Sequence, residues 1–212
     1  MYKKRNVAIN HVKEHATVYV FMIILFLTGI IFGAILVNSM NFVQKQDLFF
    51  YLERFFLQIQ EGNSIEKNEV FKSSFFYHAK YLFLLLILGL SVIGLPIVWI
   101  LLFLKGLVVG FSVGFLVNQI GLKGFFLAAL SIAPQNILTI PLYIVAGSFA
   151  MIFSLTLLNK LFSRKISKPI IQPLIQYLVI FSLLIALSVI AATIEAYVAS
   201  YAMESLIASG SQ

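Results

Sequence analysis

Long apolar runs without charged residues follow one another along the chain and set its secondary structure. The hydrocarbon core of a bilayer is about 30 Å thick, so an α-helix crosses it with about 20 apolar residues. The first such run covers residues 18–37. It is longer than the roughly 7–15 apolar residues of a signal peptide, and no small-residue cleavage site follows it. The run therefore predicts a first membrane span that is not removed.

The later apolar runs predict further spans, with Lys105 separating two of them. The fold class that follows is all-α, because helices satisfy their own backbone hydrogen bonds in lipid. We expect a polytopic membrane helix bundle of about five transmembrane helices, formed by a single integral membrane domain over residues 1–212. After the first span, we expect spans at residues 82–104, 106–122, 124–159 and 172–195.

The run over residues 124–159 is too long for one straight spanning helix. At 1.5 Å per residue it would extend about 54 Å, and it contains two prolines, which interrupt the interior of a helix. We expect a half-helix, a break near residues 134–141 and a full span over residues 141–158. The sequence leaves open whether residues 124–141 re-enter or cross the membrane. The polar segment of this broken helix comprises Pro134, Gln135, Asn136, Thr139 and Pro141.

The largest segment predicted outside the membrane lies between the first two spans, at residues 41–80. Its apolar residues recur at helical spacing, with polar residues between them. Such an external helix is suited to lying among lipid headgroups, to packing on the spans or to receiving a helix of a partner. The candidate partner contacts are Phe49, Leu52, Phe55, Phe56 and Ile59.

Glycines four residues apart occur in two of the predicted spans. Small residues at this spacing let helix backbones approach closely, which matters because lipid provides no hydrophobic drive for helix association. The pattern indicates helix packing within the bundle, or alternatively the seam of a homo-oligomer. The helix-packing residues are Gly29, Gly33, Gly106, Gly110 and Gly114.

The composition excludes several classes of protein. Hydrophobic residues make up 61% of the chain and charged residues 11%, whereas soluble domains average about 45–50% and about 25%. This excludes a disordered tail, a nucleic-acid-binding domain and an ordinary water-soluble enzyme. The lipid bilayer is the expected partner. The chain has no cysteine and three histidines, so we expect neither a metal site nor a cofactor.

The distribution of Lys and Arg predicts the orientation in the membrane. A cytoplasmic N-terminus and an external C-terminus place nine of the 15 positive residues inside, as the positive-inside rule favours. The strongest anchor is the short connection that carries Arg164, Lys165 and Lys168. In this arrangement Lys105 reaches the cytoplasmic interface with its long side chain.

Signatures of catalysis or ion coupling are missing from the sequence. Glu195 follows an apolar run and is expected at the outer interface. There is no P-loop, no H-E-x-x-H and no G-x-S-x-G motif. An intramembrane hydrolase would also need a nucleophile with a neighbouring base, and no such pair is recognisable. We therefore expect that the chain is not an enzyme.

Two stretches carry a resemblance to a known family. They are HVKEHATVYVFMIILFLTGIIFGAILVNS at residues 11–39 and SFFYHAKYLFLLLILGLSVIGLPIVWILLFLKGLVVGFSVGFLVNQIGLKGFF at residues 74–126. Both resemble the stage II sporulation protein M family of endospore-forming bacteria. The resemblance implies a membrane scaffold of the sporulation septum, on the mother-cell side. It also implies a complex with stage II sporulation proteins P and D, which degrade peptidoglycan during engulfment. The family provides no catalytic residues to carry over.

Two hypotheses for the function follow. The first is a non-enzymatic scaffold that anchors peptidoglycan-degrading partners at the membrane. The second is a permease-like subunit that moves a small or lipid-like solute, since interrupted helices often border substrate sites in transporters. A substitution of Gln135 or Asn136 by Leu distinguishes them, because loss of function with intact complex assembly would favour a pathway.

Overall fold

The computed structural model describes residues 7–60, 67–162 and 170–199. Five of its helices are long and apolar enough to cross a membrane. They lie in α2 (Ala16–Ser39), α4 (Lys67–Gly89), α5 (Gly94–Ile120), α7 (Ala133–Phe162) and α8 (Ile171–Ile194). The short helix α1 (Val7–Glu14) precedes them, and α8 continues into the π-helical turn η1 (Glu195–Ala199). No strand occurs among the described residues, which confirms the predicted all-α membrane bundle.

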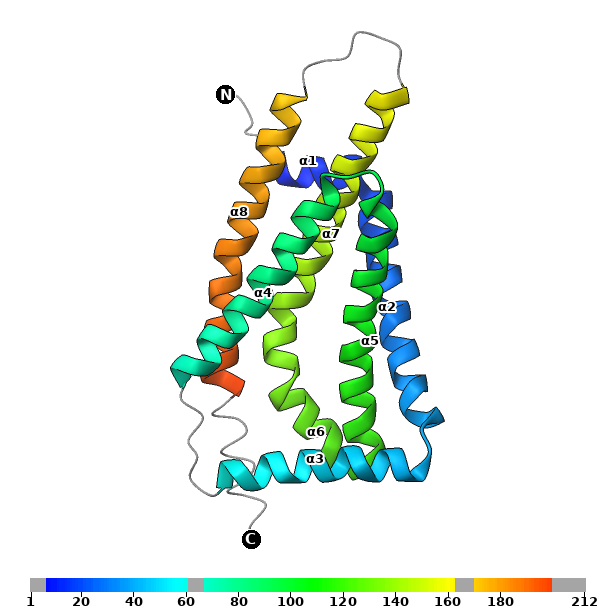
Figure 1. Cartoon of the computed structure of the whole chain (residues 1–212), viewed down its shortest axis with the longest axis vertical. Helices are drawn as coiled ribbons and strands as arrows, with labels where there is room; N and C mark the ends of the chain where they lie inside the picture. The colour runs from blue at the N-terminus through cyan, green and yellow to red at the C-terminus, as the bar shows by residue number, and fades with distance from the viewer. Residues whose placement is uncertain (1–6, 61–66, 163–169, 200–212) are drawn as a thin grey trace.

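The helix outside the bundle is α3 (Phe42–Gln60). It lies across one end of the spans, roughly perpendicular to them (Figure 1). The prediction of an external segment over residues 41–80 is therefore too long. Residues 67–80 belong to α4, which is one of the five helices that could cross the membrane. Only the part that forms α3 is separate from the spans.

The second and third spans also differ from the prediction, which put them at residues 82–104 and 106–122. The chain turns at residues 90–93, where the N–H of Gly94 donates to the carbonyl of Ser91 at 3.1 Å. From there α5 runs unbroken and carries Lys105 in its interior. Pro96 is the third residue of α5, where its missing N–H costs no helical hydrogen bond. The second span thus ends at the turn between Ser91 and Pro96, and Lys105 does not end it.

The broken helix is displaced from its predicted place as well. Gly121, with a φ of 64°, reverses the chain after α5, and α6 (Leu122–Ser131) follows. The interruption falls at Ile132 rather than across residues 134–141, and Pro141 lies inside the continuous helix α7. Pro134 is the second residue of α7, where no helical partner for its N–H exists.

The half-helix and the full span are consecutive parts of one bent path. In Figure 1, α6 leaves the lower end of α5 and continues into α7, which returns alongside α5. Ten residues of helix extend only about 15 Å, so α6 does not cross a bilayer by itself. The N–H of Asn136 still donates to the carbonyl of Ile132 at 3.3 Å, which keeps the two parts connected.

The helix α7 is at the centre of the bundle. Half of its most apolar stretch is buried, against at most a third in the other spans. The fully buried ring of Tyr143 belongs to this core. Around α7 the core is completed by Met22 and Phe26 of α2, Leu82 and Leu85 of α4, Val98 and Leu102 of α5, and Tyr177 and Phe181 of α8.

The two glycine stripes meet each other between α2 and α5. These helices run side by side in the same direction (Figure 1). A methyl group added at Gly33 would collide with the carbonyl oxygen of Leu107, and one at Gly110 with that of Ile30. Gly29 faces the carbonyl oxygen of Phe103 and Gly106 that of Phe26 in the same way, whereas a methyl group at Gly114 would lie 3.2 Å from the Cα atom of Ala34. The stripes therefore serve close helix packing inside one chain.

Candidate functional site at the centre of the bundle

His78 connects three helices in the interior of the bundle. It is the central residue of α4, eleven residues from each end of the helix, and only 5% of it is exposed. Its Nδ1 lies 2.5 Å from the hydroxyl oxygen of Tyr143 on α7. Its Nε2 lies 3.2 Å from Oε2 of Glu195 at the end of α8. We call these three residues the Tyr-His-Glu chain.

One arrangement of hydrogens satisfies both contacts with a neutral imidazole. An ionised carboxylate only accepts hydrogen bonds, so Nε2 of His78 carries the hydrogen and donates to Glu195. Nδ1 then holds a lone pair and accepts the hydrogen of the Tyr143 hydroxyl. The hydroxyl of Ser74, a buried residue of α4, makes a further hydrogen bond to Glu195. The Tyr-His-Glu chain is thus polarised from Tyr143 toward Glu195.

Lys105 of α5 lies beside this chain. Its ammonium nitrogen is 3.2 Å from the hydroxyl oxygen of Tyr77. The same nitrogen is 4.6 Å from the ring centroid of Tyr77, 5.1 Å from that of Tyr143 and 6.0 Å from that of Tyr81. The faces of aromatic rings attract cations, most strongly where water is excluded. Lys105 is also within electrostatic range of Glu195.

One prediction made from the sequence is wrong at this site. Lys105 does not reach a membrane interface, because it lies eleven residues inside α5 and three tyrosine rings surround its ammonium group. Glu195 lies at the end of α8, where the imidazole of His78 binds it to α4, and its place at the outer interface stays a prediction. The one sequence signal for this site is the presence of isolated charged residues within apolar runs. Charged residues at membrane depth usually pair with one another, so such residues indicate a buried polar contact. Their convergence depends on how the helices pack.

The polar residues of the broken helix satisfy one another. The side-chain amide of Asn136 donates to the carbonyl of Ile132 at 2.8 Å, and the hydroxyl of Thr139 donates to Asn136 Oδ1 at 3.3 Å. The carbonyl of Ile132 therefore accepts two hydrogen bonds at the break, one from the side-chain amide and one from the backbone N–H of Asn136. The side chain of Gln135 lies outside the described residues. Pro134 lies at the start of α7 and Pro141 lies within it, and neither carries a polar side chain.

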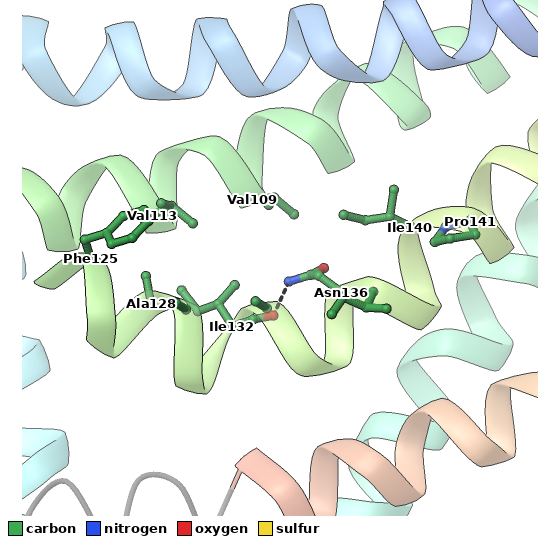
Figure 2. A pocket seen from close by; sticks show the side chains of 11 residues that line it. Val109, Val113, Phe125, Ala128, Ile132, Asn136, Ile140 and Pro141 are labelled. Carbon is green, nitrogen blue, oxygen red and sulfur yellow. Dashed lines mark hydrogen bonds between the residues drawn. The ribbon is translucent and has the colours of Figure 1, made fainter.

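A cavity of about 560 Å³ lies between α5 and the α6–α7 path. Figure 2 shows Val109 and Val113 on one side, and Ala128 and Ile132 on the other. Asn136 is the single polar residue among the 11 that line it. Because that amide is already hydrogen-bonded, the cavity suits an apolar chain better than a polar solute.

The candidate partner contacts on α3 are only partly described. Phe49 is 36% exposed and the adjacent Phe50 52% exposed, while the side chains of Leu52, Phe55, Phe56 and Ile59 lie outside the described residues. Arg54 places its guanidinium 4.9 Å from the centroid of the Phe50 ring. Among the side chains of α3 that the structure describes, the other exposed large apolar residues are Phe42, Val43 and Tyr51.

The two N-terminal histidines lie close together without a third metal ligand. The ring centroids of His11 and His15 are 4.7 Å apart, and His11 stacks on Phe149 of α7. Burial and the neighbouring His15 lower the pKa of His11, although Glu14 opposes them. No group of three His, Cys, Asp or Glu residues suited to a metal occurs in the described ranges.

The fold and the buried site together define the class: a polytopic helical membrane protein whose spans are joined by polar side chains at membrane depth. The sequence model of the family described as stage II sporulation protein M matches residues 22–200. The chain belongs to this family, and it is accordingly a sporulation-related membrane protein. No curated protein and no solved structure matches it.

Proposed function

We propose that the chain is a non-enzymatic membrane scaffold that anchors peptidoglycan-degrading partners at the sporulation septum during engulfment. The observation that carries this proposal, beside the family, is the position of α3. This helix lies across the end of the bundle (Figure 1), and its described aromatic side chains include the exposed Phe42, Phe50 and Tyr51. Exposed aromatic residues are frequent anchors of protein interfaces. The partners we propose are stage II sporulation proteins P and D.

The chemistry of the bundle supports a scaffold rather than a hydrolase. The Tyr-His-Glu chain contains a base and an acid, but the hydroxyl of Tyr143 is fully buried and bonded to His78. A wall polymer outside the membrane has no access to it. A scaffold instead acts by raising the effective concentration of an enzyme near its insoluble substrate.

The proposed orientation puts α3 on the outer side of the membrane. With Lys105 inside the bundle, eight positive residues instead of nine remain on the side of the N-terminus. Arg164, Lys165 and Lys168 are still concentrated in the short connection between α7 and α8. Short connections rich in Lys and Arg stay in the cytoplasm. This orientation brings α3 to the wall that the proposed partners degrade.

Co-purification from sporulating cells tests the proposal. Replacing Phe50 and Tyr51 of α3 by Ser should reduce recovery of the partners about tenfold, as the loss of one good interface anchor does. Phe76→Ser is the matched control, because Phe76 is 68% exposed but belongs to α4. Undiminished recovery from a correctly inserted Phe50→Ser, Tyr51→Ser variant would contradict the role of α3.

A permease-like subunit is the second candidate, favoured by the apolar cavity beside the broken helix. Asn136→Leu makes this cavity wholly apolar in its lining, and Gln135→Leu removes the neighbouring amide. The scaffold proposal expects normal sporulation and normal partner recovery from both variants. Failed sporulation with normal partner recovery would favour a pathway for a lipid-like solute.

A further inference from the structure

The Tyr-His-Glu chain contains a proton acceptor that the scaffold function does not use. Nδ1 of His78 keeps its lone pair in the bundle interior and shares it with the hydroxyl of Tyr143. On the other side of the ring, the carboxylate of Glu195 is in place to stabilise a positive charge. A neutral imidazole between a hydroxyl donor and a carboxylate is one proton short of an ion pair.

We propose that Tyr143, His78 and Glu195 form a proton-binding site, and that a proton bound there switches Tyr143 from hydrogen-bond donor to acceptor. The proton comes from water and adds to Nδ1 of His78, which gives an imidazolium with a donor on each nitrogen. The N–H bond forms as an O–H bond of a hydronium ion breaks, which leaves a water molecule. The hydroxyl hydrogen of Tyr143 rotates away, and its oxygen accepts the new N–H.

The charges around the site limit it to a single proton. Every packed element contributes: α4 brings Ser74, Tyr77 and Tyr81 to the site, and α5 brings Lys105. With a neutral imidazole, the ammonium of Lys105 and the carboxylate of Glu195 balance. One bound proton gives the cluster a net charge of about +1. A second proton would be repelled by the ammonium of Lys105 and the imidazolium of His78, and this repulsion is strong at low effective dielectric.

The burial of His78 favours a proton over a larger ligand. The His78 side chain is 6% exposed, whereas that of Glu195 is 27% exposed. The apolar cavity of Figure 2 is lined by α5, α6 and α7, and none of the three site residues lines it. Protons therefore reach the site past Glu195, at the end of α8 that points toward α3 (Figure 1). The site responds to the pH on that side of the bundle.

Nitrogen NMR of the full chain in lipid nanodiscs, with ¹⁵N-labelled histidine, tests the inference. His78→Gln identifies the His78 signals among those of three histidines. We expect the neutral tautomer with hydrogen on Nε2 at neutral pH, and an imidazolium on acidification while the protein remains folded. Hydrogen on Nδ1 in the neutral form, or no proton uptake by the folded protein, would overturn the proposal without any further variant.

Two substitutions should move proton uptake in opposite directions. Glu195→Gln removes the carboxylate that stabilises the imidazolium, so a smaller fraction of His78 should be protonated at a given pH. Tyr143→Phe removes the donor that favours the neutral ring, so uptake should occur at a higher pH. Matched controls are Glu69→Gln and Tyr197→Phe, both exposed residues, which should leave the uptake unchanged. A shift in the same direction from both site variants would refute the paired roles.

Discussion

The bundle is joined in two different ways on its two sides. Between α2 and α5, glycines bring the backbones into direct contact and no side-chain hydrogen bond is needed. Between α4, α7 and α8, the Tyr-His-Glu chain and the Tyr177 hydroxyl, which donates to Leu86 at 3.0 Å, form the connections. Lipid weakens the hydrophobic drive between helices, so both close packing and polar bonds substitute for it. Only the second way brings ionisable side chains together.

The largest effect is expected where a backbone blocks any added atom. Gly110→Ala places a methyl group against the carbonyl of Ile30, and separating α2 from α5 should cost about 3 kcal/mol. Trp99 is the sole tryptophan, and it contacts Phe21 of α2, so its fluorescence during thermal unfolding in detergent reports the loss.

Gly147→Ala is the matched control for the packed side. The nearest atoms to its added methyl group would be side-chain atoms at 3.8–3.9 Å, which is ordinary contact distance. If Gly110→Ala were as stable as Gly147→Ala, the direct backbone contact would not be what joins α2 to α5.

A smaller loss is expected on the polar side. His78→Leu leaves Tyr143 without its acceptor and Glu195 without its imidazole donor, which should cost about 2 kcal/mol. Lys80→Leu on the same helix changes an exposed side chain and should cost much less. The measurement is chemical unfolding in mixed micelles. Equal stability of the two variants would show that the Tyr-His-Glu chain contributes nothing to holding α4, α7 and α8 together.

The smallest effect concerns the contact of α1 with the bundle. The pKa of His11 lies below its ordinary value of 6.5 in the folded protein, because burial and His15 disfavour its charge. The unfolded chain then binds more protons at pH values below 6.5, so stability falls as the pH decreases through that range. His11→Gln should flatten this dependence in thermal unfolding at several pH values, whereas a similar slope in wild type and variant would contradict it.

Composition and local pattern predicted much of the fold. The uncharged runs predicted five spans, the number that the structure shows, although α4 begins before its run and α5 contains Lys105. The glycine spacing pointed to the residues that α2 and α5 use for packing. The predicted span boundaries differ from those of the structure. The charge of Lys105 suggests the end of a span, whereas the chain turns between Ser91 and Pro96. Helix ends in lipid depend on backbone partners, which Ser, Gly and Pro mark better than a single lysine does.

The candidate site was beyond the reach of local patterns. His78 and Tyr143 are 65 residues apart in the chain, and His78 and Glu195 are 117 apart. Apolar periodicity identifies each helix but carries no information on which faces meet, so Lys105 and Glu195 were assigned to interfaces. The sequence by itself determined the membrane class and the number of spans, because the transfer of apolar residues into lipid depends on each segment alone. Only the tertiary structure decided where the polar side chains meet, because that depends on how separate helices rotate and pack.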